Sequence, residues 1–240
     1  MNLTPPHRQL PEPREVRISL PDAELEGALA LPEEVRGLVL FAHGSGSSRH
    51  SPRNRYVAEV LQADGLGTLL MDLLTRAEDE IDQFTRQFRF DIELLSNRLT
   101  GAIDWLERRP ETHELPIGLF GASTGAAAAL CAAAARPDRV RAVVSRGGRP
   151  DLAGEALEHV RAPTLLIVGA DDTPVIPLND AARRRMKASV VMRLVPGASH
   201  LFEEPGTLAT ASALARDWFV RQLALEANGG FSLSAKDQTG

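Results

Sequence analysis

The sequence is poor in cysteine, in basic charge and in long apolar runs. Its single cysteine, Cys131, excludes a disulfide within these 240 residues. The longest uninterrupted apolar run, residues 126–135, is shorter than the roughly 20 residues that a membrane-spanning helix needs. Residues 1–14 contain no apolar core of the signal-peptide kind, and the net charge of −5 provides no basic surface for nucleic acid. We therefore expect a cytoplasmic protein without a membrane or nucleic-acid partner.

The chain also lacks internal repeats and any insertion long enough to form a separate lid domain. With 43% hydrophobic residues, it can bury one large core. We expect a single domain over residues 15–226. A loose, proline-containing lead-in (1–14) precedes it, and a polar tail (227–240), expected to be disordered, follows.

Buried strand patterns alternate with helical patterns along the chain. Residues 16–20 and 25–31 predict an antiparallel pair, joined by a turn at Pro21-Asp22. The later apolar runs are typical of fully buried parallel strands, and such alternation predicts a doubly wound sheet with helices on both faces. Residues 74–85 are acidic and lack periodicity, so no element is assigned to them. The remaining expected strands are 38–42, 68–73, 117–120, 142–145, 164–168 and 189–195, and the expected helices are 56–63, 88–106, 126–135, 179–187 and 208–223.

The sequence Gly121-Ala122-Ser123-Thr124-Gly125 joins an expected strand to an expected helix. In this context the turn holds the serine in a strained backbone conformation and projects its Oγ above the sheet. The two flanking glycines lack a Cβ, which lets the strand and the helix approach closely. Ser123 is therefore the candidate nucleophile.

A serine nucleophile needs a base to accept its proton. His200 is the best candidate, because it follows the last expected strand and comes after Ser123 in the chain. His50, in the loop after strand 38–42, could also reach the site. We interpret the remaining candidates as surface residues: His7, His113 and His159.

The base in turn needs an acid that holds its tautomer. Asp171 and Asp172 follow strand 164–168, between the nucleophile and the base in the chain. The order serine, aspartate, histidine is the order used by α/β-hydrolases. We choose Asp172, with Asp171 as the runner-up and Asp151 as a weaker third candidate.

An attacking serine creates an oxyanion that needs two hydrogen-bond donors. The backbone N–H of Thr124 is one, and the other is expected from the loop that begins His43-Gly44-Ser45-Gly46. We assign the second donor to Ser45. His43 is interpreted as a residue that shapes this loop rather than as a base.

Three arginines lie past expected strand ends: Arg53, Arg146 and Arg149. Each could bind a substrate carboxylate as a bidentate donor. The alternative is an internal ion pair, for instance with Asp151 or Glu203.

These motifs together make the chain, from about residue 16 to residue 225, resemble the dienelactone hydrolase-like group of α/β-hydrolases. The resemblance favours Asp172, which lies three residues after Gly169 and three before Val175. It departs at Ser123, because dienelactone hydrolases proper use a cysteine nucleophile. The motifs that carry it are His43-Gly44-Ser45-Gly46-Ser47, Ser51-Pro52-Arg53-Asn54, Gly121-Ala122-Ser123-Thr124-Gly125, Ser145-Arg146-Gly147-Gly148, the Gly169-x-x-Asp172-x-x-Val175 spacing and His200-Leu201-Phe202-Glu203-Glu204.

The resemblance also suggests a functional link to a phosphoribosyltransferase, because some similar proteins are fused to such a domain. Nothing in these 240 residues corresponds to one.

We therefore expect an α/β-hydrolase fold and a serine hydrolase that cleaves a small carboxylic ester or lactone through an acyl-enzyme on Ser123. This chemistry needs no metal or organic cofactor. Two alternatives stay open: a ligand-binding or regulatory protein with negligible turnover, and an acyltransferase or thioesterase that uses the same residues. The sequence does not predict the oligomeric state.

Overall fold

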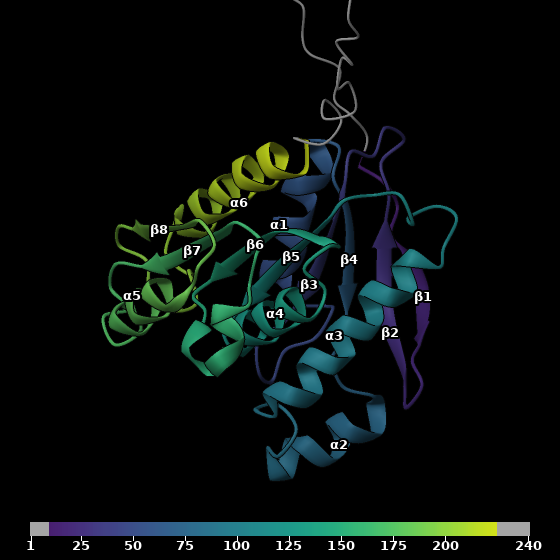
Figure 1. Ribbon diagram of the computed structural model, residues 1–240, viewed down its shortest axis with the longest axis horizontal. Helices are drawn as coiled ribbons and strands as arrows, with labels where there is room; N and C mark the ends of the chain where they lie inside the picture. Colours follow the sequence, from purple (N-terminus) through teal and green to yellow (C-terminus); the bar gives the residue numbers. More distant parts are fainter. Residues whose placement is uncertain (1–9, 225–240) are drawn as a thin grey trace, which may run out of the picture.

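A computed structural model describes residues 10–224 and contains an eight-stranded sheet (Figure 1). The strand order is β1-β2-β4-β3-β5-β6-β7-β8. β2 pairs antiparallel with β1 and with β4, and all the other pairs are parallel. The strands are β1 (Arg14–Ser19), β2 (Glu24–Ala30), β3 (Leu38–Ala42), β4 (Gly67–Met71), β5 (Ile117–Ala122), β6 (Val140–Arg146), β7 (Thr164–Gly169) and β8 (Val190–Val195). The expected mostly parallel, doubly wound sheet is confirmed.

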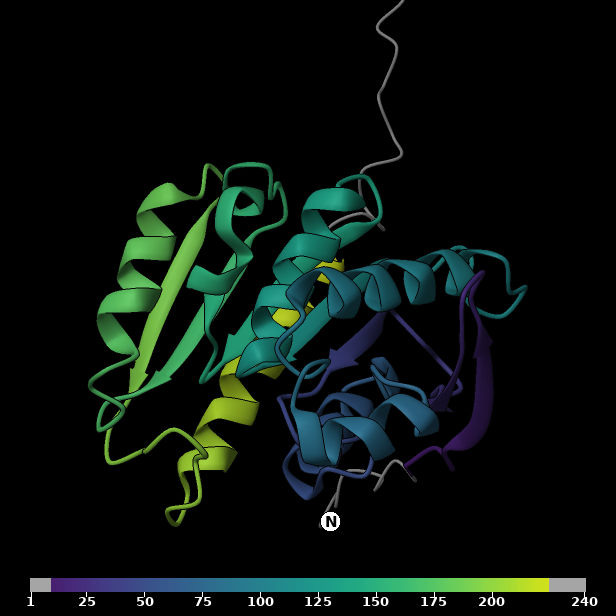
Figure 2. The same cartoon turned by 90° about the horizontal axis from the view of Figure 1, so that it is seen from below.

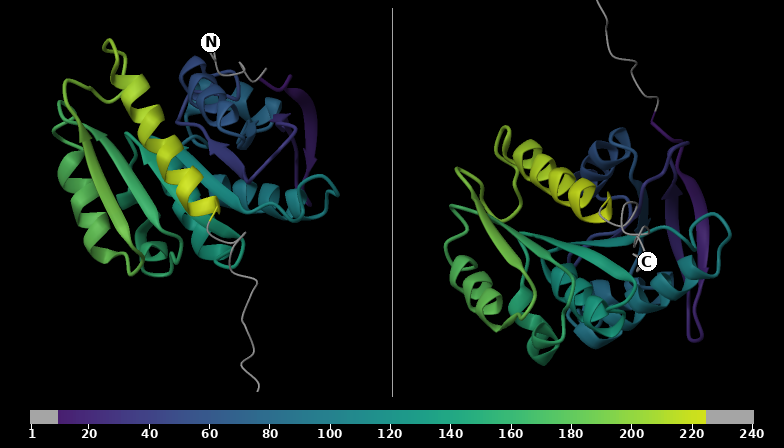
Figure 3. Two further views of the ribbon diagram at one scale, coloured as in Figure 1. Left: turned by 90° about the horizontal axis from the view of Figure 1, so that it is seen from above. Right: turned by 45° about the horizontal axis from the view of Figure 1, so that its top comes forward.

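Helices cover both faces of the sheet (Figure 2 and Figure 3). Alternate residues of β3 point to opposite faces: Leu40 packs into the core on the side of α3 and α4, and Phe41 into the core on the side of α1 and α6. The sheet therefore separates two apolar layers. The helices are α1 (Pro52–Ala63), α2 (Arg76–Thr85), α3 (Ile92–Glu107), α4 (Thr124–Ala135), the 3₁₀ segment η1 (Pro150–Glu158), α5 (Ile176–Arg185) and α6 (Thr207–Ala224).

Helix α2 (Arg76–Thr85) forms within residues 74–85, to which the sequence analysis assigned no element, so that interpretation was wrong. Thr75 caps the helix by accepting from the Glu78 N–H, and the Glu78 side chain accepts from the Thr75 N–H. This reciprocal cap is signalled by Thr-x-x-Glu in the sequence. The apolar periodicity is missing because the buried residue of α2 is the charged Asp82.

Several other elements differ from expectation. Helix α1 begins at Pro52, four residues earlier than expected. Helix α3 begins at Ile92 rather than at residue 88, because the Asp91 side chain caps it by accepting from the Leu94 N–H. Helix α5 begins at Ile176, three residues earlier than expected, with a proline in its first turn. The 3₁₀ segment η1, kinked at Gly154 (φ 56°), was not anticipated.

Residues 1–9 of the expected lead-in (1–14) and the whole expected tail (227–240) lie outside the described residues. The single domain over residues 15–226 stays a prediction. Between residues 10 and 224, no helix is both long and apolar enough to cross a membrane.

Candidate active site

Ser123 occupies the sharp turn between β5 and α4. Its backbone has φ 52° and ψ −123°. Residues that carry a side chain rarely adopt such a positive φ, because it raises their conformational free energy. Gly125 permits the close approach behind the turn, since a Cβ there would lie 2.3 Å from the Ala42 carbonyl oxygen. The strained turn leaves the Ser123 side chain partly exposed at the carboxyl edge of the sheet.

Three side chains from separate loops form a hydrogen-bonded chain at this edge. The Asp172 Oδ2 lies 2.7 Å from Nδ1 of His200, and Nε2 of His200 lies 3.4 Å from Oγ of Ser123. Because a carboxylate only accepts, the ring proton is on Nδ1, and the Nε2 lone pair faces the serine hydroxyl. The longer serine contact is of the kind seen before substrate binds. This arrangement can remove a proton from Ser123.

The structure does not bring the alternative acids and bases into this chain. Asp171 is exposed, and Asp151 forms an ion pair with Arg149. His50 is exposed on its loop. His113 and His159 are also exposed, and His7 lies outside the described residues.

The two expected oxyanion donors lie side by side. Thr124 is the first residue of α4, so its N–H has no acceptor within the helix. The Ser45 N–H donates to the Thr124 hydroxyl oxygen at 3.0 Å. Gly44 packs against the nucleophile, since a Cβ on Gly44 would lie 3.1 Å from Cβ of Ser123. The loop after β3 thus brings the Ser45 N–H to the edge of the site.

A cavity of about 220 Å³ adjoins the nucleophile. Arg146 lines this cavity and is only 6% exposed. Its guanidinium lies 5.6 Å from the centre of the Phe202 ring and donates to Oδ1 of Asn54 at 3.4 Å, while its Nε has no partner among the described residues. Burial, and then the nearby charge of Arg53, lower the pKa of Arg146 to about 10, so it stays charged at neutral pH. No carboxylate of the described chain pairs with this buried cation.

The other two arginines have internal partners. Arg53 also lines the cavity but forms an ion pair with Glu203 at 2.8 Å. Arg149 donates two hydrogen bonds to Asp151, which raise the pKa of Arg149. The ion-pair interpretation therefore fits Arg53 and Arg149, and Arg146 differs from both.

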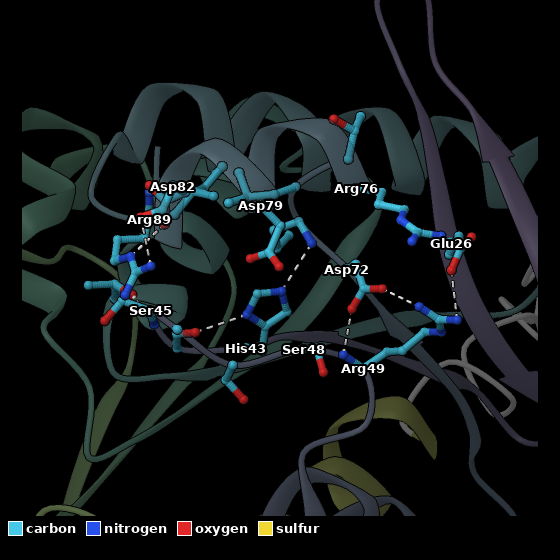
Figure 4. Close-up of a pocket in the computed structure, with 18 of the residues that line it drawn as sticks. Glu26, His43, Ser45, Ser48, Arg49, Asp72, Arg76, Asp79, Asp82 and Arg89 are labelled. Carbon is cyan, nitrogen blue, oxygen red and sulfur yellow. Dashed lines mark hydrogen bonds and ion pairs between the residues drawn. The ribbon is translucent and has the colours of Figure 1, made fainter. Parts of the chain in front are cut away.

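A second cavity of about 290 Å³, which the sequence did not predict, lies on the other side of the loop after β3, beneath α2 (Figure 4). Two of the arginines that line it form internal ion pairs: Arg49 with Asp72 and Glu26, and Arg89 with Asp82. Ser123 does not line it. The only sign of this cavity in the sequence is the helix-capping motif that predicts α2.

Residues 10–224 contain no group of three or more histidine, cysteine, aspartate or glutamate side chains that could hold a metal ion.

Solved structures of other proteins share the fold of this chain. A dienelactone hydrolase from Anabaena variabilis superposes with a TM-score of 0.88 and 58% identity, over 89% of this chain and 99% of that chain. Est1E from Butyrivibrio proteoclasticus has a TM-score of 0.73 at 16% identity, over 88% of this chain and 99% of that chain, and so shares the fold.

A curated Mycobacterium tuberculosis protein with the name "Putative phosphoribosyl transferase" is 56% identical over 209 residues. The match covers 87% of this chain and 46% of that protein, so this chain spans about half the length of the curated relatives it matches. The link to a phosphoribosyltransferase stays a prediction.

The family model described as "Dienelactone hydrolase family" matches residues 25–224. This match covers strands β3 to β8 and the edge that carries Ser123, and the Anabaena enzyme is 58% identical. The chain belongs to the dienelactone hydrolase family of α/β-hydrolases.

Proposed function

We propose that this chain is a serine hydrolase that cleaves a small carboxylic ester or lactone through an acyl-enzyme on Ser123. The family supports ester or lactone hydrolysis in general. The observation that carries the serine mechanism is the chain of hydrogen bonds from Asp172 through His200 to Ser123 at a strained turn.

In the first half of the reaction, Oγ of Ser123 attacks the carbonyl carbon while Nε2 of His200 takes its proton. The carbonyl oxygen becomes an oxyanion, which the N–H groups of Thr124 and Ser45 stabilise. His200 then gives the proton to the leaving alcohol oxygen as the ester bond breaks. Asp172 orients His200 and stabilises its charged form.

In the second half, water replaces the alcohol. His200 removes a proton from the water as its oxygen attacks the acyl-enzyme, and returns the proton to Oγ of Ser123 as the acid product leaves. The sum of the two halves is ester plus water giving acid plus alcohol.

A fluorophosphonate probe tests this proposal without knowledge of the substrate, because the probe phosphonylates only an activated serine. We expect intact mass spectrometry to show one adduct on the wild-type protein and none on Ser123→Ala. His200→Ala should form the adduct far more slowly, because the serine keeps its proton. A well-folded wild-type protein that forms no adduct would contradict the proposal and favour a ligand-binding role.

We also propose that the substrate carries an anionic group that binds Arg146. A buried charge without a counter-charge is costly, and Arg146 lines the same cavity as Ser123. A carboxylate on the substrate would accept a hydrogen bond from the unpaired Nε of Arg146 and neutralise the charge of the guanidinium.

Matched substrates test the role of Arg146. We expect Arg146→Met to raise the KM for an ester with a carboxylate on its acyl group by roughly 10- to 100-fold, the value of a hydrogen bond to a charged group. The KM for the isosteric neutral amide-bearing ester should change little. Arg149→Met is the control, because Arg149 is paired with Asp151 and does not line the cavity. Equal loss on both substrates would show that Arg146 only supports the fold.

A further inference from the structure

His43 lies between the loop that carries Ser45 and the chain that follows β4. It comes directly after β3, is 8% exposed, and forms part of the wall of the second cavity (Figure 4). The Leu73 N–H lies 3.0 Å from its Nε2, and its Nδ1 lies 2.9 Å from the Gly44 carbonyl oxygen. Both ring nitrogens are therefore engaged by the backbone, and neither faces Ser123.

These two contacts specify one form of the ring. The Leu73 N–H can only donate, so Nε2 of His43 must be an unprotonated acceptor. The Gly44 carbonyl can only accept, so Nδ1 must carry the proton and donate it. The neutral tautomer with its proton on Nδ1 satisfies both contacts, and no other form of the ring does.

The contact with Gly44 has a consequence for its neighbour. The Gly44 carbonyl and the Ser45 N–H belong to one peptide unit, and no peptide bond in the described chain is cis. In a trans peptide unit the two groups point in opposite directions. Because His43 holds the carbonyl, the Ser45 N–H points away from His43, to the side where it meets Thr124.

We propose that His43 is a positioning residue of the oxyanion hole, which fixes the Gly44-Ser45 peptide so that the Ser45 N–H faces the reacting carbonyl. The inference deepens the proposed function and rests on it. The Thr124 hydroxyl oxygen accepts this N–H in the resting protein, next to the N–H of Thr124 itself. An oxyanion formed on Ser123 then takes the place of the hydroxyl oxygen as acceptor.

The surroundings of His43 keep it neutral. Burial lowers its pKa, while the Gly44 carbonyl, Asp72 and Asp79 oppose this effect. The charge of Asp72 is itself paired with Arg49. If Nε2 were protonated, its N–H would face the Leu73 N–H, and two donors cannot form a hydrogen bond with each other. The two contacts of His43 with Leu73 and Gly44 therefore require the neutral ring. Since the pKa falls on folding, the stability that His43 contributes is complete above pH 6.5 and is lost as the pH falls toward the lowered value.

Two amide variants separate the contacts. In His43→Asn, the side-chain N–H₂ occupies the position of Nδ1 and can still donate to the Gly44 carbonyl. In His43→Gln, the amide reaches the position of Nε2, where its oxygen can accept from Leu73, but the donor to Gly44 is lost. Both variants are measured for melting temperature, for fluorophosphonate labelling rate at Ser123, and for kcat and KM on a reactive ester.

We expect His43→Gln to lower the labelling rate and kcat by roughly 10²- to 10³-fold with little change in KM, as for loss of one oxyanion donor. His43→Asn should stay within about tenfold of wild type. Nitrogen NMR of labelled histidine in the wild-type protein should show a ring protonated on Nδ1 at neutral pH that keeps this form below pH 6.5.

The outcomes distinguish the two proposals. Suppose that the wild-type protein labels. Equally fast labelling of His43→Gln, or an NMR spectrum that places the proton on Nε2, would then overturn the role of His43 and leave the serine mechanism standing. Equal losses in both amide variants, in step with their melting temperatures, also overturn it, because they indicate a general structural role. Failure of the wild-type protein to label overturns the serine mechanism and the role of His43 with it.

Discussion

Asp172→Asn will slow acylation of Ser123 by about 10³- to 10⁴-fold. The carboxylate oxygen lies 2.7 Å from Nδ1 of His200 and is the group that keeps the Nε2 lone pair directed at Ser123. An amide in its place can donate to Nδ1, which favours the opposite tautomer, and it removes the negative charge that stabilises the imidazolium. The loss should appear in kcat and in the fluorophosphonate labelling rate, with little change in KM.

The adjacent carboxylate provides the control for this prediction. Asp171 precedes Asp172 directly and has the same side chain, but it is exposed and forms no contact with His200. We expect Asp171→Asn to label within about twofold of wild type, since it makes no contact with the reacting groups. If Asp171→Asn were the slower variant, the acid of the site would have to be reassigned.

Gly125→Ala will destabilise the protein by about 3 kcal/mol or more. A Cβ at this position would lie 2.3 Å from the Ala42 carbonyl oxygen and 2.5 Å from that of His43. Both obstacles are backbone atoms at the end of β3, so relief requires moving the strand or helix α4. For a domain of this size, thermal unfolding should show a fall in melting temperature of roughly 6–12 °C.

Gly101→Ala is the matched control for this substitution. Its Cβ would meet a Leu20 methyl carbon at 2.7 Å, which is the end of a side chain that can rotate away. Alanine also gains about 1 kcal/mol of helix propensity within α3. We expect a melting temperature within a few degrees of wild type, or about 1 kcal/mol. A similar fall in melting temperature in both variants would contradict this prediction, because it would show that a clash with backbone atoms at Gly125 destabilises the protein no more than a clash with a side chain at Gly101.

Much of the fold followed from the apolar pattern, because the strands of a doubly wound sheet are buried on both faces and appear as short continuous runs. β3 and β7, for example, were expected at 38–42 and 164–168 and are observed at Leu38–Ala42 and Thr164–Gly169. The apolar pattern did not predict helix α2, because its buried residue, Asp82, is charged and its apolar residues Ile81 and Phe84 are exposed. A prediction from apolar periodicity assumes that the buried residues of a helix are apolar. It fails for a helix whose buried residue is charged and forms an ion pair.

The site was predicted at the level of residue types and chain order, and less well at the level of individual contacts. Gly-x-Ser-x-Gly indicated Ser123, and the position of His200 after the last strand indicated the base, but neither pattern gives a distance. The sequence placed Arg146 and Arg149 on equal terms, whereas in the structure a carboxylate pairs with Arg149 and none with Arg146. Which neighbour a side chain meets depends on how the loops pack, and residue spacing does not encode this.

The attachment of α2 has a consequence for the motions of the molecule. The helix is held by Asp82, which accepts from Arg89, and by Glu78, which accepts from Arg98. Burial opposes the ionisation of Asp82, but hydrogen bonds from Arg89 and Phe88 lower its pKa, so the pair is charged at neutral pH. Asp82 is 1% exposed and Arg98 4% exposed, so detachment of α2 would separate buried ion pairs, which salt screens only weakly. We therefore expect detachment of α2 from the second cavity to depend on protonation of Asp82 at low pH more than on ionic strength, while the sheet and the Ser123 edge remain folded.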